Sequence, residues 1–175
     1  GYAAASVDVL SRAMNVPRAS LYQTFGDKEE LFLATVAHYG NTRIARILRW
    51  LDGETDAQKD LEGFFDDLIS LATGHPEMTG CLIACVLADA AGKCLKMRGE
   101  LSGRFATIEA RLTERIVTAQ AAGQIDSHLP APTLAVMLAA TARGLMVRAR
   151  ADAGPDELHP AAMAVVALCC RTEPV

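Results

Sequence analysis

The sequence has few aromatic side chains, no long apolar run and no signal at its start. Phe, Trp and Tyr make up 5% of its 175 residues, whereas hydrophobic residues make up 51% and charged residues 22%. This balance is typical of a globular chain rather than a disordered one. No apolar run approaches the roughly 18 residues that span a bilayer, and no secretory signal opens the chain. We therefore expect a cytoplasmic protein with no membrane partner.

Disulfide, catalytic and metal-binding patterns are also missing. The five cysteines are odd in number and lack the spacing of a disulfide scaffold, so they predict reduced thiols. The histidines His38, His75, His128 and His159 are isolated, without a triad partner or metal-ligand spacing. No glycine-rich phosphate loop is present. We therefore predict no catalytic site, no metal site and no cofactor.

Alternating β-branched runs are absent, and apolar residues instead recur three and four positions apart. This spacing predicts an all-α fold. Short helices with tight turns precede longer helices rich in Ala, Leu, Met and Val, so we expect a head at 1–38 and a helical-bundle body at 39–175. The predicted helices span 6–14, 18–25, 27–50, 57–73, 79–91, 97–122, 131–151 and 156–170.

The head is predicted to contain two short helices joined by a tight turn. Ser6 can cap the first helix, and Pro17 suits the first position of the second. Leu21 and Phe25 are four residues apart and must share a buried face, which leaves small and polar side chains opposite. Such a face can enter a DNA major groove, where glutamine pairs with adenine edges. The pattern therefore predicts a helix-turn-helix whose second helix reads DNA.

A lysine at the start of the next helix is a second candidate contact. Asp27 and Glu30 form a capping pattern after Gly26, and Lys28 lies in the first turn, where the helix dipole disfavours a cation. Lys28 is either a solvated lysine among carboxylates or a phosphate ligand acting with nearby backbone N–H groups. The neighbouring groove-facing helix favours the phosphate ligand.

The run "GYAAASVDVLSRAMNVPRASLYQTFGDKEEL" resembles the DNA-binding head of the TetR family of bacterial transcriptional repressors, and "LYQTFGDKEEL" is its specific part. The stretches "GCLIACVLADAAG", "AQAAGQI" and "LAVMLAATARGLMVRARADAG" resemble, more loosely, the family's ligand-binding and dimerisation body. The resemblance covers nearly the whole chain. It implies a palindromic double-stranded DNA operator, a small-molecule effector, and a homodimer formed through the last two helices.

The resemblance also implies roles for individual residues of the head. Tyr22 and Lys28 would contact phosphates, while other side chains of the second helix would lie in or beside the groove. The chain departs from the family at Asn15, where a glycine is usual, and at Pro17, where serine or threonine is usual. Residues 1–38 carry more acidic than basic side chains, and we expect that the family's first helix, often preceded by basic residues, is missing from this sequence. The candidate DNA-binding residues are Ser6, Pro17, Arg18, Ala19, Ser20, Tyr22, Gln23, Thr24 and Lys28.

Apolar faces in the body have two interpretations. A simple helix-bundle core is the default for each residue, and the resemblance implies that some of these side chains line an effector cavity instead. Such cavities are mostly apolar with few polar groups. The candidate ligand-binding residues are Phe64, Leu68, Cys81, Cys85, Phe105, Ile108 and Met137.

Cys81 and Cys85 lie four apart, hence on one helix face, and leave three interpretations open. They are buried small hydrophobes, or a redox or electrophile sensor, or, least favoured, part of a metal site that two thiols alone cannot complete. The predicted function is a TetR-type repressor released from its operator by a small molecule. The alternatives are a thiol-based repressor acting through Cys81 or Cys85, and a helical binding protein that no longer binds DNA.

Overall fold

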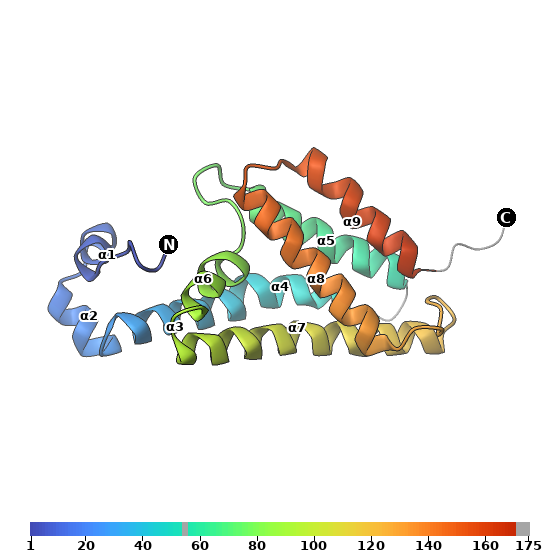
Figure 1. The fold of residues 1–175 in the computed structure, drawn as a ribbon, viewed down its shortest axis with the longest axis horizontal. Coiled ribbons are helices and arrows are strands. Elements are labelled where there is room, and N and C mark those ends of the chain that lie inside the picture. The colour runs from blue at the N-terminus through green and yellow to red at the C-terminus, as the bar shows by residue number, and fades with distance from the viewer. Residues whose placement is uncertain (54–55, 171–175) are drawn as a thin grey trace.

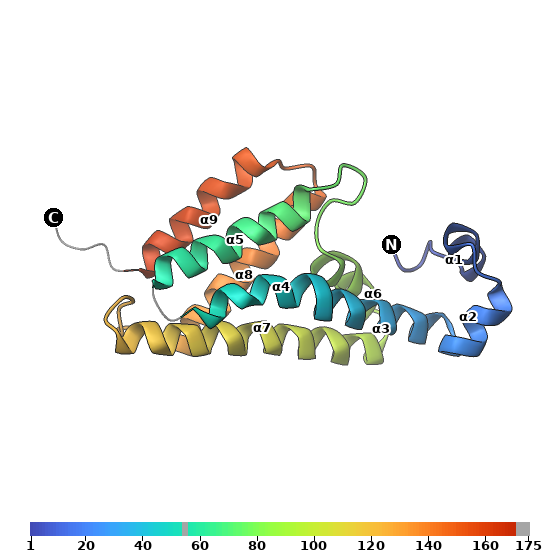
Figure 2. The same ribbon diagram turned by 180° about the vertical axis from the view of Figure 1, so that it is seen from behind.

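The computed structural model describes residues 1–53 and 56–170; residues 54–55 and 171–175, which belong to the predicted body, lie outside the described part. Helices account for most of the described residues, and an isolated bridge joins Ile125 to Cys170. The predicted all-α fold is confirmed. Figures 1 and 2 show a small head at one end of an elongated helical body. None of the described helices is long and apolar enough to cross a membrane.

The described helices follow one another along the chain from the head into the body. The first two helices form the outer part of the head, the third leads from the head into the body, and the rest build the body in two layers, with α7 (Leu95–Ala121) alongside α4 (Ala45–Leu48) in one and α5 (Ala57–Thr73) beside α9 (Pro155–Cys169) in the other (Figure 1). The elements are α1 (Val7–Met14), α2 (Arg18–Phe25), α3 (Lys28–Tyr39), η1 (Gly40–Ile44), α4 (Ala45–Leu48), η2 (Arg49–Asp52), α5 (Ala57–Thr73), η3 (Leu82–Leu87), α6 (Ala88–Ala91), α7 (Leu95–Ala121), α8 (Ala131–Arg150) and α9 (Pro155–Cys169).

The predicted helices agree with this order except where π-helical turns occur. The predicted ranges 18–25 and 57–73 coincide with α2 and α5. The predicted helix 27–50 is continuous in course, but the π-helical turn η1 divides it into α3 and α4. The predicted helix 79–91 begins too early, because the backbone at Cys81 is extended and the π-helical turn η3 starts after it.

Local capping explains the geometry of the head. The Ser6 hydroxyl accepts a hydrogen bond from the N–H of Val9 at 3.2 Å, so the predicted cap of α1 is confirmed. Asn15 ends α1 with a φ of 52°, in the left-handed region that asparagine tolerates better than most residues. Pro17 is the residue before α2 rather than its first helical residue, which corrects the prediction. Its carbonyl still accepts the N–H of Leu21 at 3.2 Å.

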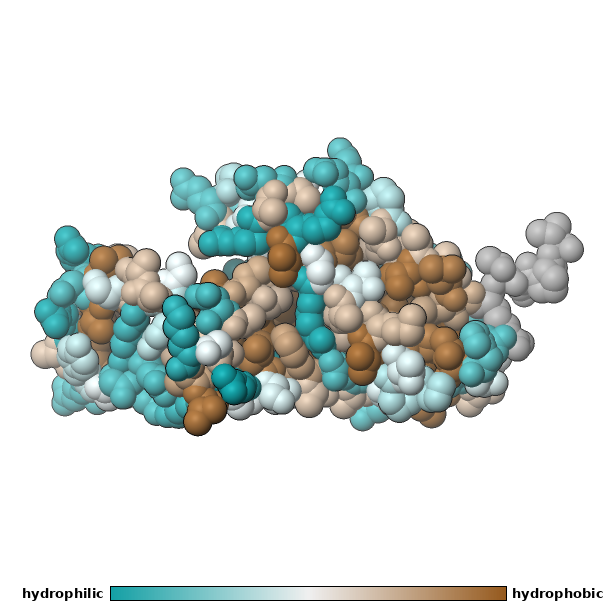
Figure 3. Space-filling model, in the orientation of Figure 1, coloured by the Kyte–Doolittle hydropathy of each residue, from teal (hydrophilic) through white to brown (hydrophobic). Residues whose placement is uncertain are grey.

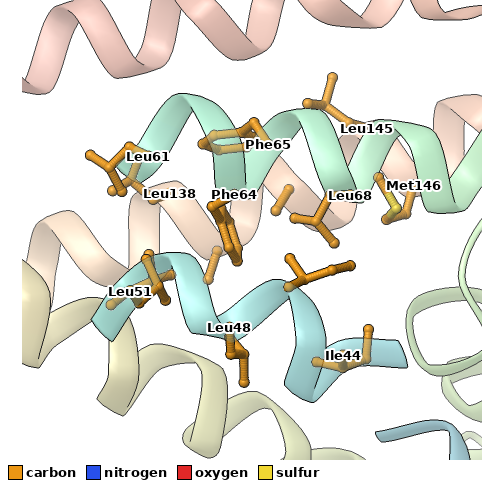
Figure 4. Close-up of a cluster of buried hydrophobic side chains, with 14 of the residues drawn as sticks. Ile44, Leu48, Leu51, Leu61, Phe64, Phe65, Leu68, Leu138, Leu145 and Met146 are labelled. Carbon is orange, nitrogen blue, oxygen red and sulfur yellow. The ribbon is translucent and has the colours of Figure 1, made fainter. Parts of the chain in front are cut away.

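The body core lies between α5, α8 and the α4 segment. Phe64 and Leu68 point from α5 toward the residues of η1 and α4, including Leu48 (Figure 4). Phe65 packs edge-to-face on Phe64, with ring centroids 5.4 Å apart. Leu138 of α8 is fully buried within the same chain. One face of α8 is therefore buried in the core, and its other face is exposed.

A buried ion pair joins α5 to α7. The Nε of Arg115 donates to the Oδ2 of Asp60 at 2.7 Å, and the two side chains are 3% and 11% exposed. Nearby, the side-chain oxygen of Gln124 accepts the N–H of Ala57 at 3.1 Å. The start of α5 is thereby fixed against the second half of α7.

Replacing Arg115 should therefore be costly. Arg115→Met leaves the Asp60 carboxylate buried without its partner, and we expect a loss of about 3–5 kcal/mol in the free energy of unfolding. Urea denaturation at fixed protomer concentration measures this loss. The double variant Arg115→Met with Asp60→Asn should lose less than Arg115→Met alone, because no charge then stays buried.

The matched control is Arg148→Met, since Arg148 pairs with Glu157 at the surface, where both side chains are more than half exposed. Its loss should stay below about 1 kcal/mol. Equal losses in the buried and the surface variants would contradict the assigned role of the Asp60–Arg115 pair.

Candidate functional site

The outer face of α2 is short-chained and polar. Leu21 is 4% exposed and Phe25 is half-buried, so these two residues hold α2 on the head. Ala19, Ser20 and Gln23 are exposed on the opposite side. This arrangement presents one amide, one hydroxyl and one methyl on a narrow surface, which is the chemistry that reads base edges in a major groove.

Larger side chains flank this face. Nη1 of Arg18 lies 2.6 Å from Oδ1 of Asp8 on α1. The pKa of Arg18 is raised first by its hydrogen bond with Tyr22 and then by the charge of Asp8. Tyr22 is 43% exposed and Thr24 is exposed as well. Arg18 thus links the two helices of the head, while its neighbours on α2 stay accessible.

The N-terminal residues of the chain cover Lys28. Its Nζ lies 4.4 Å from the centroid of the Tyr2 ring and donates to the carbonyl of Ala3 at 3.5 Å. The Tyr2 ring packs in turn on Phe32 of α3, with centroids 4.9 Å apart. Lys28 therefore lies at the junction of the head and α3, next to α2 in sequence.

The start of α3 also contacts the body. Oδ1 of Asp27 accepts the N–H of Glu30 at 2.9 Å, which confirms the predicted cap. The carboxylate of Glu30 does not return the bond and pairs instead with Lys96 of α7. The thiol of Cys94, just before α7, contacts the Oε2 of Glu29 at 3.6 Å. The sequence carried no signal for these contacts, because they join residues more than 60 positions apart.

The body contains a small apolar cavity of about 40 Å³ between α4, α5, α7 and α8. Arg143 is its one charged lining residue among those described, and its guanidinium stacks on the Phe105 ring at 3.9 Å and pairs with Glu109. The structure brings five of the candidate ligand-binding residues to this cavity: Phe64, Leu68, Cys81, Phe105 and Ile108.

The other two candidates lie elsewhere. Met137 is 48% exposed and does not line the cavity, which corrects its assignment; the cavity face of α8 carries Ala139, Ala142 and Met146. Helical phase explains the difference, since a residue two positions before Ala139 points about 200° away from it. Cys85 lines a second cavity.

The second cavity has a volume of about 600 Å³ and lies between η1, the end of α5, the loop that follows it, η3 and the end of α8. Cys81 lines both cavities. The second cavity also holds two arginines that sequence reasoning missed, Arg43 and Arg150. In the sequence both look like ordinary surface arginines, and only the folded structure reveals their common cavity.

The cysteines differ in their surroundings. The Tyr39 hydroxyl donates to the sulfur of Cys81 at 3.6 Å, and burial, reinforced by that thiol, raises the pKa of Tyr39. The thiol of Cys85 is half-buried and donates to the carbonyl of Met146 at 3.7 Å. Burial raises the pKa of the Cys170 thiol to about 11, so this thiol stays protonated at neutral pH. In residues 1–53 and 56–170, no three His, Cys, Asp or Glu side chains are grouped to hold a metal ion.

Comparison with known proteins gives matches over both parts of the chain. Residues 1–35 match the family described as "Bacterial regulatory proteins, tetR family", and residues 57–165 match "Tetracyclin repressor-like, C-terminal domain". The transcriptional regulator AcuR of Cereibacter sphaeroides is 28% identical over 161 residues, which are 91% of this chain and 73% of AcuR.

Solved structures are similar over nearly the full length. The regulatory protein TetR from Rhodobacter sphaeroides is 28% identical with a TM-score of 0.84, over 95% of this chain and 88% of that one. A cysteine mutant of the TetR family transcriptional regulator CifR, solved with 26-bp double-strand operator DNA, is 26% identical with a TM-score of 0.82. That match covers 95% of this chain and 87% of the CifR chain.

Proposed function

The chain belongs to the TetR family of bacterial regulatory proteins and is a DNA-binding transcriptional regulator; we propose that it represses transcription by occupying a palindromic operator. The observation that carries this proposal is the exposed polar face of α2, opposite the buried Leu21. In the proposed division of labour, a head at 1–38 binds DNA and a body at 39–175 binds an effector and a second copy of the chain.

Within the head, each candidate DNA-binding residue has a proposed contact. Gln23 reads an adenine edge, with Ser20 and Ala19 beside it in the groove. Tyr22 and Lys28 bind phosphates and so fix the register of the head on the duplex. The remaining proposed contacts come from residues at the rim of this face, namely Ser6, Pro17, Arg18 and Thr24.

The outer faces of α8 and α9 support a homodimer. Met137, Val147 and Leu168 are 48%, 54% and 85% exposed, and apolar residues gather over these two helices in Figure 3. Exposed apolar side chains on one side of the molecule are typical of a protein interface. A two-fold dimer also fits a palindromic operator, because two recognition helices must enter major grooves about 34 Å apart.

Release from DNA is proposed to follow effector binding in the body. An effector shifts the equilibrium only through a difference in affinity between the DNA-binding state and the released state. The cavity lined by Phe64, Leu68 and Phe105 supports an effector site, although its present 40 Å³ requires the body to open before a ligand enters. Such opening would change the packing of α7 and α8 and with it the spacing of the heads.

A thiol switch is a second candidate mechanism for the same repressor. Cys85 favours it, because its half-buried thiol lines the 600 Å³ cavity rather than the small core cavity. Cys81 is less suited to attack a reagent, since its side chain is buried and contacts Tyr39. In this version an electrophile bonds to the Cys85 sulfur and forces η3 to move.

Gln23→Ala tests the recognition face. We expect it to weaken binding to the operator by about 1–3 kcal/mol and to relax the sequence preference, because the adenine contact is lost. Fluorescence anisotropy with DNA from upstream of the gene, against a scrambled duplex, measures both effects. Gln58→Ala, on the exposed face of α5, is the matched control and should bind like the wild type. Unchanged operator preference in Gln23→Ala would refute the proposed face.

Lys28→Ala tests the phosphate contact. Binding should weaken on both the operator and the scrambled duplex, and the slope of log K against log salt concentration should fall by about 1 for each head. Lys59→Ala removes an exposed lysine from α5, distant from the head, and should leave the slope unchanged. If the two lysine variants gave the same slope, Lys28 would have no phosphate contact.

Treatment with N-ethylmaleimide tests the thiol switch. The thiol adds across the maleimide double bond, forming an S–C bond while its proton ends on the neighbouring carbon. We expect operator binding to be lost in the wild type and kept in Cys85→Ser, as measured by anisotropy with mass spectrometry of the adduct. Cys170→Ser should behave like the wild type, because the raised pKa keeps that thiol protonated. Loss of binding in Cys85→Ser as well would exclude a switch at this residue.

A further inference from the structure

The large cavity of the body is open enough for a small ligand. Its volume of about 600 Å³ lies within the range of roughly 300–1,000 Å³ that is typical of small-molecule sites. Its walls come from elements far apart in the sequence: η1, the end of α5, η3 and the last residue of α8. A site assembled from several elements responds to any movement of one against another.

Two arginines on different elements face this cavity without a carboxylate partner. Arg43 belongs to η1 and Arg150 ends α8. In the described part of the chain neither forms an ion pair. Nη1 of Arg150 donates one hydrogen bond to the carbonyl of Thr79 at 3.3 Å. The body's other cavity-lining arginine, Arg143, is instead neutralised by Glu109. The second cavity therefore keeps free cationic donors.

The remaining titratable groups of the cavity do not cancel this charge. Glu77 is the one carboxylate among the described lining residues, and it lies exposed on the loop after α5. Its backbone N–H donates to Nδ1 of His75 at 3.3 Å. Tyr39 keeps its proton, since burial raises its pKa. The lining thus has a net positive charge.

The rest of the lining is apolar. Leu71, Leu82 and Val86 face the cavity beside Met78. We propose that this cavity binds a small amphipathic carboxylate, with the carboxylate between Arg43 and Arg150 and the apolar part against these side chains. A carboxylate suits this position because the guanidinium group donates paired hydrogen bonds to it.

This inference rests on the proposed function, because it adds the second cavity to the body's possible effector sites and assigns a chemical class to the effector that binds there. The same site also lies next to the head. Leu82 and Val86 also line a further cavity of about 320 Å³, together with Leu10, Met14 and Phe32 from the head and α3. A ligand that displaces η3 would therefore also change the shape of the cavity beside the head.

Isothermal titration calorimetry with octanoate and with 1-octanol, in the absence of DNA, tests the proposal. The two probes share an eight-carbon chain and differ in charge, so only octanoate should depend on the arginines. We expect Arg43→Gln and Arg150→Gln each to weaken octanoate binding about tenfold or more, as the loss of a charged hydrogen bond does. Glu77→Gln should strengthen octanoate binding, because it removes the opposing carboxylate.

Arg46→Gln, on α4 and outside this cavity, is the matched control and should bind octanoate like the wild type. Circular dichroism melts verify that the variants fold. Failure of the wild type to bind octanoate, or equal octanoate binding by the wild type and both cavity-arginine variants, would overturn the assignment. Operator binding is measured separately by anisotropy, so either result leaves the test of the repressor function independent.

Discussion

Among the ion pairs of α7, one joins it to α5 in the body and another joins it to α3 at the head end. The pair between Arg115 and Asp60 is buried, so its separation would strand a charge in the core. The pair between Lys96 and Glu30, at the head end, has both side chains about half exposed and contributes little to stability. Movement of α7 against α5 is therefore expensive, whereas the Lys96–Glu30 pair opposes movement of α3 against the start of α7 only weakly.

The π-helical turn η3 borders three cavities. Ile83 lines the small core cavity and Cys85 the large cavity, while Leu82 and Val86 line both the large cavity and the one beside the head. A wider helical turn of this kind often occurs at functional sites, because it breaks the regular spacing of side chains. An occupant of either body cavity meets the same short segment, so a reversible ligand and a thiol adduct would act through one element. In both cases the coupling is limited by the difference in affinity between the two states.

The sequence was most informative where structure is local. Ser6 and Asp27 could be predicted as caps because capping depends on residues three positions apart. Asn15 could be placed in a left-handed turn because asparagine tolerates a positive φ. Hydrophobic spacing located the helices but not the π-helical turns, since one extra residue in a turn leaves the pattern intact on either side. It also placed Met137 in the cavity, because spacing alone does not say which apolar face of a helix is buried inside the chain. The cavity role of Arg43 depends on a contact between distant elements and has no local signature.

Lys28 illustrates how a side chain can have contacts within the free protein and still make the proposed contact with a DNA phosphate. Its ammonium lies over the Tyr2 ring and donates to the carbonyl of Ala3, with a long contact of 3.5 Å. A partly exposed cation–π contact contributes about 0.5–1 kcal/mol, whereas a hydrogen bond to a charged partner contributes about 1.5–3 kcal/mol. Exchange of the ring for the proposed phosphate is therefore favourable. Because Tyr2 also packs on Phe32 of α3, that exchange would loosen the N-terminal residues from the helix that joins the head to the body.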